Sequence, residues 1–256
     1  MLYVLARTNR DVLGRFAGSR TLLAFDFDGT LAPIVTNPAR AAMRSSTRRL
    51  LEDLARRYPC VVISGRSRAD VRRRLLGVPL AGVVGNHGLE PGLATARAQR
   101  TARRWVPALE AGLDGIPGVV VEDKGLSLAV HYRAAPRKKE AHARILAAAA
   151  GLGAVRLVGG KQVLNILPAG APGKGRALER ARARLGCDSA VYVGDDETDE
   201  DVFALDVPGR LLGIRVGRRR GSAAEYFIRT QREIDLLLRS FLAFRPEQPR
   251  APRRTH

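Results

Sequence analysis

Short apolar runs alternate with amphipathic segments of helical length along most of this chain, and this alternation constrains the fold more than any other feature. The run at 21–27 is almost continuously apolar, and similar runs occur at 60–64, 81–84 and 190–193. Runs of this length are typical of buried strands in a parallel sheet. We therefore expect an α/β fold built around a parallel sheet.

The pattern changes between residues 91 and 169. Two helical segments each precede a pair of short strands here, and tight turns are expected at 122–125 and at Gly159-Gly160. A helix followed by a hairpin, repeated twice, predicts a small antiparallel α/β module. We therefore expect this segment to be a cap that is inserted into the parallel core.

The core is then discontinuous and consists of residues 1–90 and 170–245. Thr230 and Glu233 are expected to cap its last helix. The proline- and arginine-rich residues 246–256 follow that helix. We expect them to form a disordered basic tail, because they offer little apolar surface to bury.

The composition excludes several classes of protein. Cys60 and Cys187 are the only cysteines, which excludes a disulfide framework and indicates a reducing compartment. No apolar run approaches the roughly 20 residues that a membrane helix needs. Residues 1–6 are too short for the apolar part of a signal sequence. We therefore expect a soluble, cytoplasmic protein without membrane contacts. Separately from these observations, we expect a monomer.

The charge balance is strongly basic, with 44 Lys and Arg against 25 Asp and Glu, a net charge of +19. This raises the alternative of a nucleic-acid-binding protein. The basic residues fall in short clusters within amphipathic patterns, however, and no aromatic residues interleave with them as stacking on bases requires. We expect solvated helix faces and no bound nucleic acid, since the acidic clusters described next would repel a phosphate backbone.

Carboxylates gather at the ends of two predicted strands. Asp26 and Asp28 end the run at 21–27, where Gly29 allows a sharp turn, and a second acidic cluster at 195–201 follows another strand. Ligands bind at the carboxyl ends of the strands in open parallel sheets. Buried neighbouring carboxylates need a compensating cation. The two clusters together predict an oxygen-ligated Mg²⁺ site.

Two further loops offer donors for a phosphate group. Ser64-Gly65-Arg66 follows the predicted strand at 60–64 and supplies a hydroxyl, a backbone N–H and a guanidinium. Lys174 opens a predicted helix after Pro172-Gly173. This segment is not a Walker A loop, because Pro168 occupies the first glycine position and Gly175 replaces Ser or Thr.

In their order along the chain, these elements resemble the four motifs of the haloacid dehalogenase (HAD) superfamily of phosphatases. The matching motifs are Asp26-x-Asp28-Gly29-Thr30, Ser64, Lys174 and Gly194-Asp195-Asp196. A finer resemblance, to trehalose-6-phosphate phosphatases, covers about residues 20–240. It rests on the segments 63–66, 85–90, 122–125, 131–133 and 194–200. The resemblance implies a HAD-like Rossmannoid core with an inserted α/β cap.

The resemblance also implies an activity, the Mg²⁺-dependent hydrolysis of trehalose 6-phosphate to trehalose and phosphate, the last step of trehalose biosynthesis. Asp26 would attack phosphorus to form an aspartyl-phosphate, while Asp28 would protonate the leaving oxygen and then activate water. Ser64 and Lys174 would neutralise the phosphoryl oxygens. The implied Mg²⁺ ligands are the Asp26 carboxylate, the Asp28 carbonyl and Asp195, with support from Asp196 and Asp199.

Residues in both the core and the cap are implied to bind the sugar phosphate. They are Gly65, Arg66, His87 and Glu90 in the core, and Lys124, His131, Arg133 and Asn165 in the cap. Strand alternation independently places His131 and Arg133 on one face. The family usually has glutamate where this chain has Asn165, and an amide offers sugar hydroxyls a different set of hydrogen bonds. HAD phosphatases acting on mannosyl-3-phosphoglycerate or sucrose phosphate therefore remain alternatives.

Overall fold

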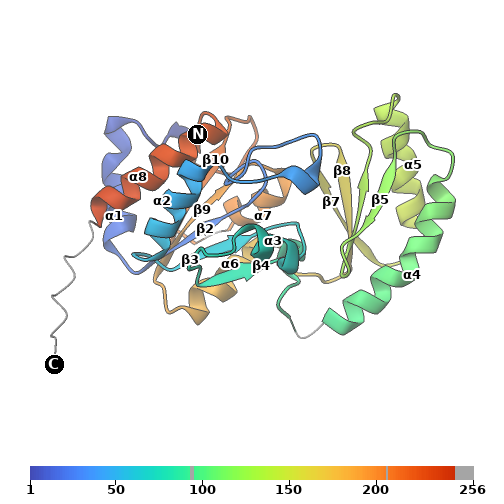
Figure 1. Cartoon of the computed structure of the whole chain (residues 1–256), viewed down its shortest axis with the longest axis horizontal. Coiled ribbons are helices and arrows are strands. Elements are labelled where there is room, and N and C mark those ends of the chain that lie inside the picture. The colour runs from blue at the N-terminus through green and yellow to red at the C-terminus, as the bar shows by residue number, and fades with distance from the viewer. Residues whose placement is uncertain (93–94, 206, 246–256) are drawn as a thin grey trace.

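The computed structural model describes residues 1–92, 95–205 and 207–245. The predicted disordered tail at 246–256 lies outside the described residues. The described chain forms two sheets that lie side by side along the long axis of the molecule (Figure 1). The larger sheet is parallel and the smaller one is antiparallel, which confirms the expected α/β architecture.

The larger sheet has seven strands, all paired in parallel. In spatial order they are β1 (Leu2–Tyr3), β11 (Tyr226–Ile228), β10 (Leu211–Val216), β9 (Ser189–Gly194), β2 (Thr21–Phe25), β3 (Cys60–Ile63) and β4 (Gly82–Val84). The central strand β2 pairs with β3 on one side and with β9 on the other. Every residue of β2 is buried, as its continuous apolar run predicts.

Helices cover both faces of this sheet. On one face, Leu23 and Phe25 of β2 pack into a core with α1 (Arg10–Gly18), α2 (Ser45–Ala55), α3 (Arg68–Arg74) and α8 (Ile234–Phe244). On the other face, Leu22 and Ala24 pack with α6 (Lys174–Arg184) and α7 (Glu200–Phe203). Because successive strand residues point to opposite faces, one continuous apolar run supplies both cores.

The smaller sheet lies within the segment 91–169 that was expected to form the cap. Its order is β5 (Val120–Asp123), β6 (Leu128–His131), β8 (Val163–Pro168) and β7 (Val155–Gly160). Two helices, α4 (Thr95–Leu113) and α5 (Lys138–Ala150), cover its outer face in Figure 1. Trp105 and Leu109 of α4 pack with Ile145 of α5 and Leu128 of β6 in a separate hydrophobic core.

Two local expectations are wrong. Gly159 and Gly160 belong to β7 and pair with Leu164 and Val163, so the turn falls two residues later, at 161–162, where Gln162 has a φ of 62°. The side chain of Thr230 makes no capping hydrogen bond. Glu233 is used elsewhere, since its carboxylate accepts from the Arg229 N–H and the Tyr3 hydroxyl.

Candidate active site

Four functional segments meet at the carboxyl edge of the parallel sheet. Strands β9, β2 and β3 are neighbours, so the residues that follow them, Asp195, Asp26 and Ser64, emerge at the same edge. Lys174 is the first residue of α6, which packs on this part of the sheet. The topology alone therefore brings together residues that are up to 169 positions apart in the sequence.

Lys174 links the two buried carboxylates next to it. Its Nζ lies 3.1 Å from Asp26 Oδ1 and 2.8 Å from Asp199 Oδ1, and its side chain is only 2% exposed. Burial raises the pKa of Asp26, and the nearby Lys174 ammonium opposes this shift. The pKa of Lys174 is itself raised, because its two carboxylates outweigh the effect of burial. The ammonium is thus held charged beside Asp26.

Asp26, Asp195 and Asp199 form a cluster that could hold a metal ion. One oxygen of each carboxylate lies within 4.8 Å of the others, and all three residues are buried. Asp195 Oδ1 is buried and has no hydrogen-bond partner within the described part of the chain. Burial raises the pKa of Asp195 to about 6, against the opposing effect of Lys161.

Asp199 differs from the other two because its oxygens are occupied. Oδ1 accepts from Lys174 and from the buried Tyr192 hydroxyl at 2.6 Å, and Oδ2 accepts from the Asp196 N–H at 2.8 Å. The side chain therefore holds Lys174 and the start of the acidic loop in place. Asp196 is only partly buried, and burial raises its pKa.

Asp28 faces Arg66 across the edge of the sheet. The guanidinium donates to both carboxylate oxygens, from Nε at 2.6 Å and from Nη2 at 2.7 Å. The same group also donates to Asp70 at 2.8 Å and to the Pro38 carbonyl. Arg66 thus orients Asp28 and ties it to the first turn of α3.

Two polar side chains of the site are buried without partners. The Thr30 hydroxyl and both ring nitrogens of His87 have no hydrogen bond within the described residues. The His87 ring packs directly on Gly65, where a Cβ would lie 2.5 Å from Cε1, and His87 has a φ of 55°. Burial, followed by the charges of Lys124 and Lys174, lowers the pKa of His87 well below its usual value. A neutral imidazole with a free donor and a free acceptor suits a ligand hydroxyl.

Lys124 connects the antiparallel module to the core. Its Nζ donates to Asn165 Oδ1 on β8 at 3.1 Å and to the Gly65 carbonyl at 3.3 Å. Burial lowers the pKa of Lys124. Asn165 is 4% exposed and donates in turn to the Val158 carbonyl on β7 at 3.3 Å. These two predicted residues therefore face the same space as Gly65 and His87.

The other predicted substrate-binding residues are more fully engaged with the protein. Glu90 Oε2 accepts from the Arg68 N–H at 2.6 Å and from the Asn86 amide at 2.9 Å. His131 Nε2 lies 2.7 Å from Glu122 on the facing strand β5. Arg133 is exposed and donates to the Val35 carbonyl of the core and to the Lys161 carbonyl.

Sequence reasoning missed three residues that contact this site. Lys161, in the turn after β7, reaches Asp195 Oδ2 at 2.5 Å, while Tyr192 and Arg215 hold Asp199 and the acidic loop. Arg215 carries a signal that could have been used, because it is a charge within the apolar run of β10. Lys161 carries none, because its contact depends on how the antiparallel module lies against the core.

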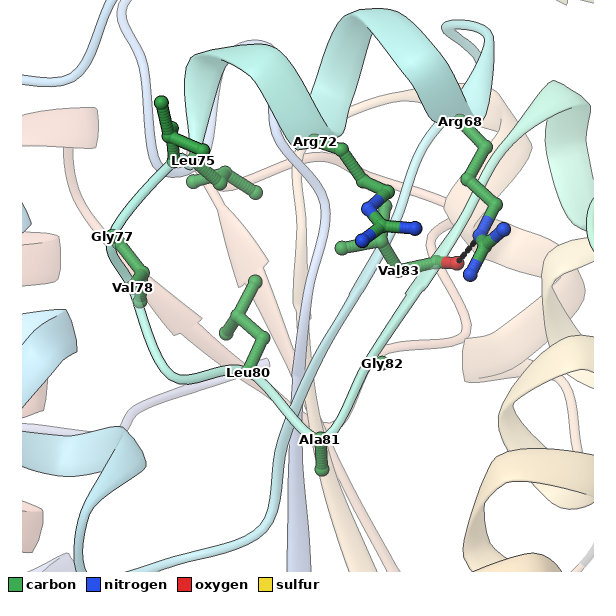
Figure 2. Close-up of a pocket in the computed structure, with 10 residues that line it drawn as sticks. Arg68, Arg72, Leu75, Gly77, Val78, Leu80, Ala81, Gly82 and Val83 are labelled. Carbon is green, nitrogen blue, oxygen red and sulfur yellow. Dashed lines mark hydrogen bonds between the residues drawn. The ribbon is translucent and has the colours of Figure 1, made fainter.

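A separate cavity lies at the edge of the parallel sheet, between α3 and β4 (Figure 2). It has a volume of about 320 Å³, is open to solvent, and is lined by apolar residues with Arg68 and Arg72 at one side. Arg68 Nε donates to the Val83 carbonyl there. None of the predicted site residues lines this cavity.

No helix in the described ranges is long and apolar enough to cross a membrane.

Known proteins match the chain in both sequence and structure. A family model described as trehalose-phosphatase matches residues 24–208. A trehalose-phosphate phosphatase of Mycobacterium avium is 37% identical over 215 residues, which cover 78% of this chain and 55% of the relative. The chain thus spans about half the length of the mycobacterial relatives that it matches.

Two solved structures show the same fold. The C-terminal domain of the trehalose-6-phosphate phosphatase of C. albicans aligns with a TM-score of 0.75 at 21% identity, covering 92% of this chain and 96% of that one. A sugar phosphatase of HAD subclass IIB aligns with a TM-score of 0.57 at 14% identity, covering 86% and 98%. The fold is therefore HAD-like, as expected. Because the family model covers most of the sequence, the chain belongs to the trehalose-phosphatase family.

Proposed function

We propose that the chain is a Mg²⁺-dependent phosphatase that hydrolyses trehalose 6-phosphate to trehalose and phosphate. The observation that carries the proposal is the buried group of Asp26, Lys174 and Asp195 at the carboxyl edge of the sheet. A nucleophile, a fixed ammonium and a carboxylate oxygen that is free to bind a metal ion suit the attack of a carboxylate on a phosphate group. Membership of the trehalose-phosphatase family supports the choice of substrate.

The residues fit Mg²⁺. The cluster consists of oxygen donors only, and the buried Asp195 Oδ1 has no other partner among the described residues. Asp26 and Asp195 would hold the ion together with the Asp28 carbonyl, while Asp196 and Asp199 support the loop. When bound, Mg²⁺ would neutralise charge on the phosphoryl oxygens and on Asp26.

In the first step, an Asp26 oxygen forms a bond to phosphorus while the bond from phosphorus to the sugar oxygen breaks. Lys174 keeps Asp26 in place and, with the Ser64 hydroxyl, stabilises the transferring oxygens. Asp28 gives a proton to the leaving sugar oxygen. Before this step Asp28 must leave its bidentate pair with Arg66 and take up a proton from solvent, and Arg66 is then free to donate to the substrate.

In the second step, water attacks phosphorus and the bond to Asp26 breaks, which restores the carboxylate. Asp28, now ionised, accepts the proton of the attacking water, so one residue serves as acid and then as base. The antiparallel module excludes other water from the site when it covers the core.

We propose that residues 91–169 act as the cap and that residues 1–90 and 170–245 act as the core. The contact from Lys124 to Gly65 and Asn165 supports a sugar site between them, with His87 beneath. Glu90 would brace the His87 loop, and His131 and Arg133 would lie at the rim of the site.

The two buried free cysteines are consistent with the reducing cytoplasm as the location.

A panel of sugar phosphates tests this function. Phosphate release from trehalose 6-phosphate, sucrose 6-phosphate and mannosyl-3-phosphoglycerate is measured with Mg²⁺ and again with EDTA. We expect trehalose 6-phosphate to have the highest kcat/KM and EDTA to abolish its hydrolysis. A higher kcat/KM for either other substrate would support the corresponding alternative, which Asn165 keeps open because it replaces the usual glutamate. Release that is unaffected by EDTA would exclude the metal-dependent mechanism.

A further inference from the structure

Arg215 is a buried arginine on the strand next to the acidic loop. It lies on β10, where it pairs with Gly194 at the end of β9, and it is 4% exposed. The rest of β10 consists of apolar residues and one glycine. Burying a guanidinium costs free energy unless its donors are matched by acceptors. The acceptors of Arg215 therefore indicate why an arginine is present on this strand.

The guanidinium donates to three acceptors, which all belong to the acidic loop or to the helix after it. Nη2 donates to the Asp195 carbonyl at 2.7 Å. Nη1 donates to the Asp196 carbonyl at 3.1 Å and to Glu200 Oε1 at 2.7 Å. Two consecutive peptide carbonyls are thus fixed by one planar group. The orientation of these peptide planes sets the direction in which the Asp195 side chain leaves the backbone.

The direction of that side chain matters because the space around it is tight. Asp195 packs against Gly29, where even a Cβ would lie 2.2 Å from Oδ2. A small rotation of the Asp195 backbone would therefore move the carboxylate away from Asp26 or into the loop at Gly29. A lysine could not replace Arg215, because an ammonium lacks the planar fork that reaches several acceptors at once.

We propose that Arg215 is a positioning residue for divalent metal binding. It fixes the backbone of Asp195 and Asp196 so that the Asp195 carboxylate faces Asp26. The inference rests on the proposed function, because it requires that Asp195 binds Mg²⁺. Arg215 itself touches neither the metal nor the substrate.

If Arg215 positions Asp195, its removal weakens Mg²⁺ binding, whereas its charge alone predicts that removal strengthens binding. Arg215 is a positive charge close to a cation site, so its removal would tighten Mg²⁺ binding if only Coulomb repulsion mattered. Loss of a positioning contact instead weakens binding, typically about 10- to 100-fold for residues that support metal ligands. The direction of the change therefore separates the two roles.

The test measures the Kd for Mg²⁺ by isothermal titration calorimetry on the full chain. The variants are Arg215→Met, which removes the donors, and Arg215→Lys, which keeps the charge beside Glu200. The matched control is Arg219→Met, because Arg219 contacts Glu197 of the same loop at 2.9 Å while its side chain is 47% exposed. The Tm of each variant without metal is recorded in parallel.

We expect Arg215→Met to raise the Kd about 10- to 100-fold and Arg215→Lys to raise it by an intermediate factor. Arg219→Met should stay within about twofold, since exposed ion pairs contribute little. An unchanged or lower Kd in folded Arg215→Met overturns the inference. If Arg215→Met does not fold, an unchanged Kd in Arg215→Lys overturns it. Failure of the unaltered chain to bind Mg²⁺ instead contradicts the proposed function, and the inference falls with it.

Discussion

At the scale of single residues, Gly29 shows how closely the two acidic segments approach each other. Its φ is +79°, and a Cβ at this position would lie 2.2 Å from Asp195 Oδ2. Gly77 also has a positive φ, of +89°, but a Cβ there would meet nothing within 4 Å. Substitutions at these two glycines therefore separate the effect of backbone strain, which both share, from the effect of a steric clash with Asp195, which only Gly29 has.

We therefore predict that Gly29→Ala reduces kcat/KM for trehalose 6-phosphate by about 100-fold or more, because Asp195 must move. Gly77→Ala should lower stability by roughly 1–2 kcal/mol through strain alone and leave kcat/KM unchanged. Steady-state kinetics and thermal unfolding of both variants check this. Equal activity in the two variants would show that the contact between Gly29 and Asp195 is unimportant.

Asn165 tests the sugar site at the same scale. In Asn165→Glu the new carboxylate can still accept from Lys124, but it loses the donor to the Val158 carbonyl. A gained or lost charged hydrogen bond to a sugar hydroxyl is worth roughly 1.5–3 kcal/mol, or about 10- to 150-fold in kcat/KM. We predict that, in this variant, kcat/KM for trehalose 6-phosphate rises by about tenfold or more relative to kcat/KM for the other sugar phosphates. An unchanged ranking together with a lower Tm would assign Asn165 a purely structural role.

At the scale of elements, α3 connects the stability of the core to the site. Asp70 in its first turn is 2.8 Å from Arg66 and 2.9 Å from both Arg73 and Arg74. Burial raises the pKa of Asp70, but hydrogen bonds from Arg74, Arg66 and Arg73 outweigh it and lower the pKa from 3.8 to about 2. A lowered pKa in the folded state means stability that is present above pH 4 and lost as the pH falls towards 2.

We predict that Asp70→Asn removes this loss. Between pH 4 and pH 2, the free energy of unfolding should fall less in the variant than in the unaltered chain. The difference should be on the order of 1 kcal/mol, since the exposure of Arg73 weakens its share. Urea unfolding across this pH range is the measurement, with Asp53→Asn as the control for an exposed carboxylate, which pairs with Arg56. The prediction would be contradicted if the free energy of unfolding fell equally with pH in Asp70→Asn and in the unaltered chain.

The elements themselves were largely predictable, because burial on both faces leaves a clear pattern. The apolar runs at β2, β3 and β9 required a parallel sheet, and the sheet in turn placed Asp26, Ser64 and Asp195 at one edge. Short edge elements such as β1 left no such pattern. The prediction of a turn at Gly159-Gly160 is wrong because glycine is also found within strands, and here it allows β7 to lie close to Glu197 and Asp196.

Contacts between distant segments could not be predicted. The pairs Asp28–Arg66 and Lys161–Asp195 depend on side-chain rotamers and on the placement of the antiparallel module. Two of the three acceptors of Arg215 are backbone carbonyls, which have no signature in the amino-acid sequence. Motifs identify which residues gather at the site, whereas the hydrogen bonds that orient them require coordinates.

At the scale of the whole molecule, Lys124 connects the two halves by donating to Asn165 on one side and to Gly65 on the other. We predict that Lys124→Met lowers kcat/KM for trehalose 6-phosphate about 10- to 100-fold, since a charged hydrogen bond is lost. Hydrolysis of p-nitrophenyl phosphate, which has no sugar hydroxyls, should change less than threefold by the same reasoning. Lys139→Met, at an exposed position of α5, is the control. Equal losses on both substrates would place Lys124 in the phosphoryl step instead.

We propose that Asp26 is the nucleophile of a phosphatase. The most direct test is the rate of phosphate release from trehalose 6-phosphate with Mg²⁺ by Asp26→Asn, compared with the unaltered chain. An amide is a poor nucleophile, so we predict a loss of several orders of magnitude in kcat with the fold retained. Release at a near-normal rate by a folded Asp26→Asn variant would contradict the covalent mechanism.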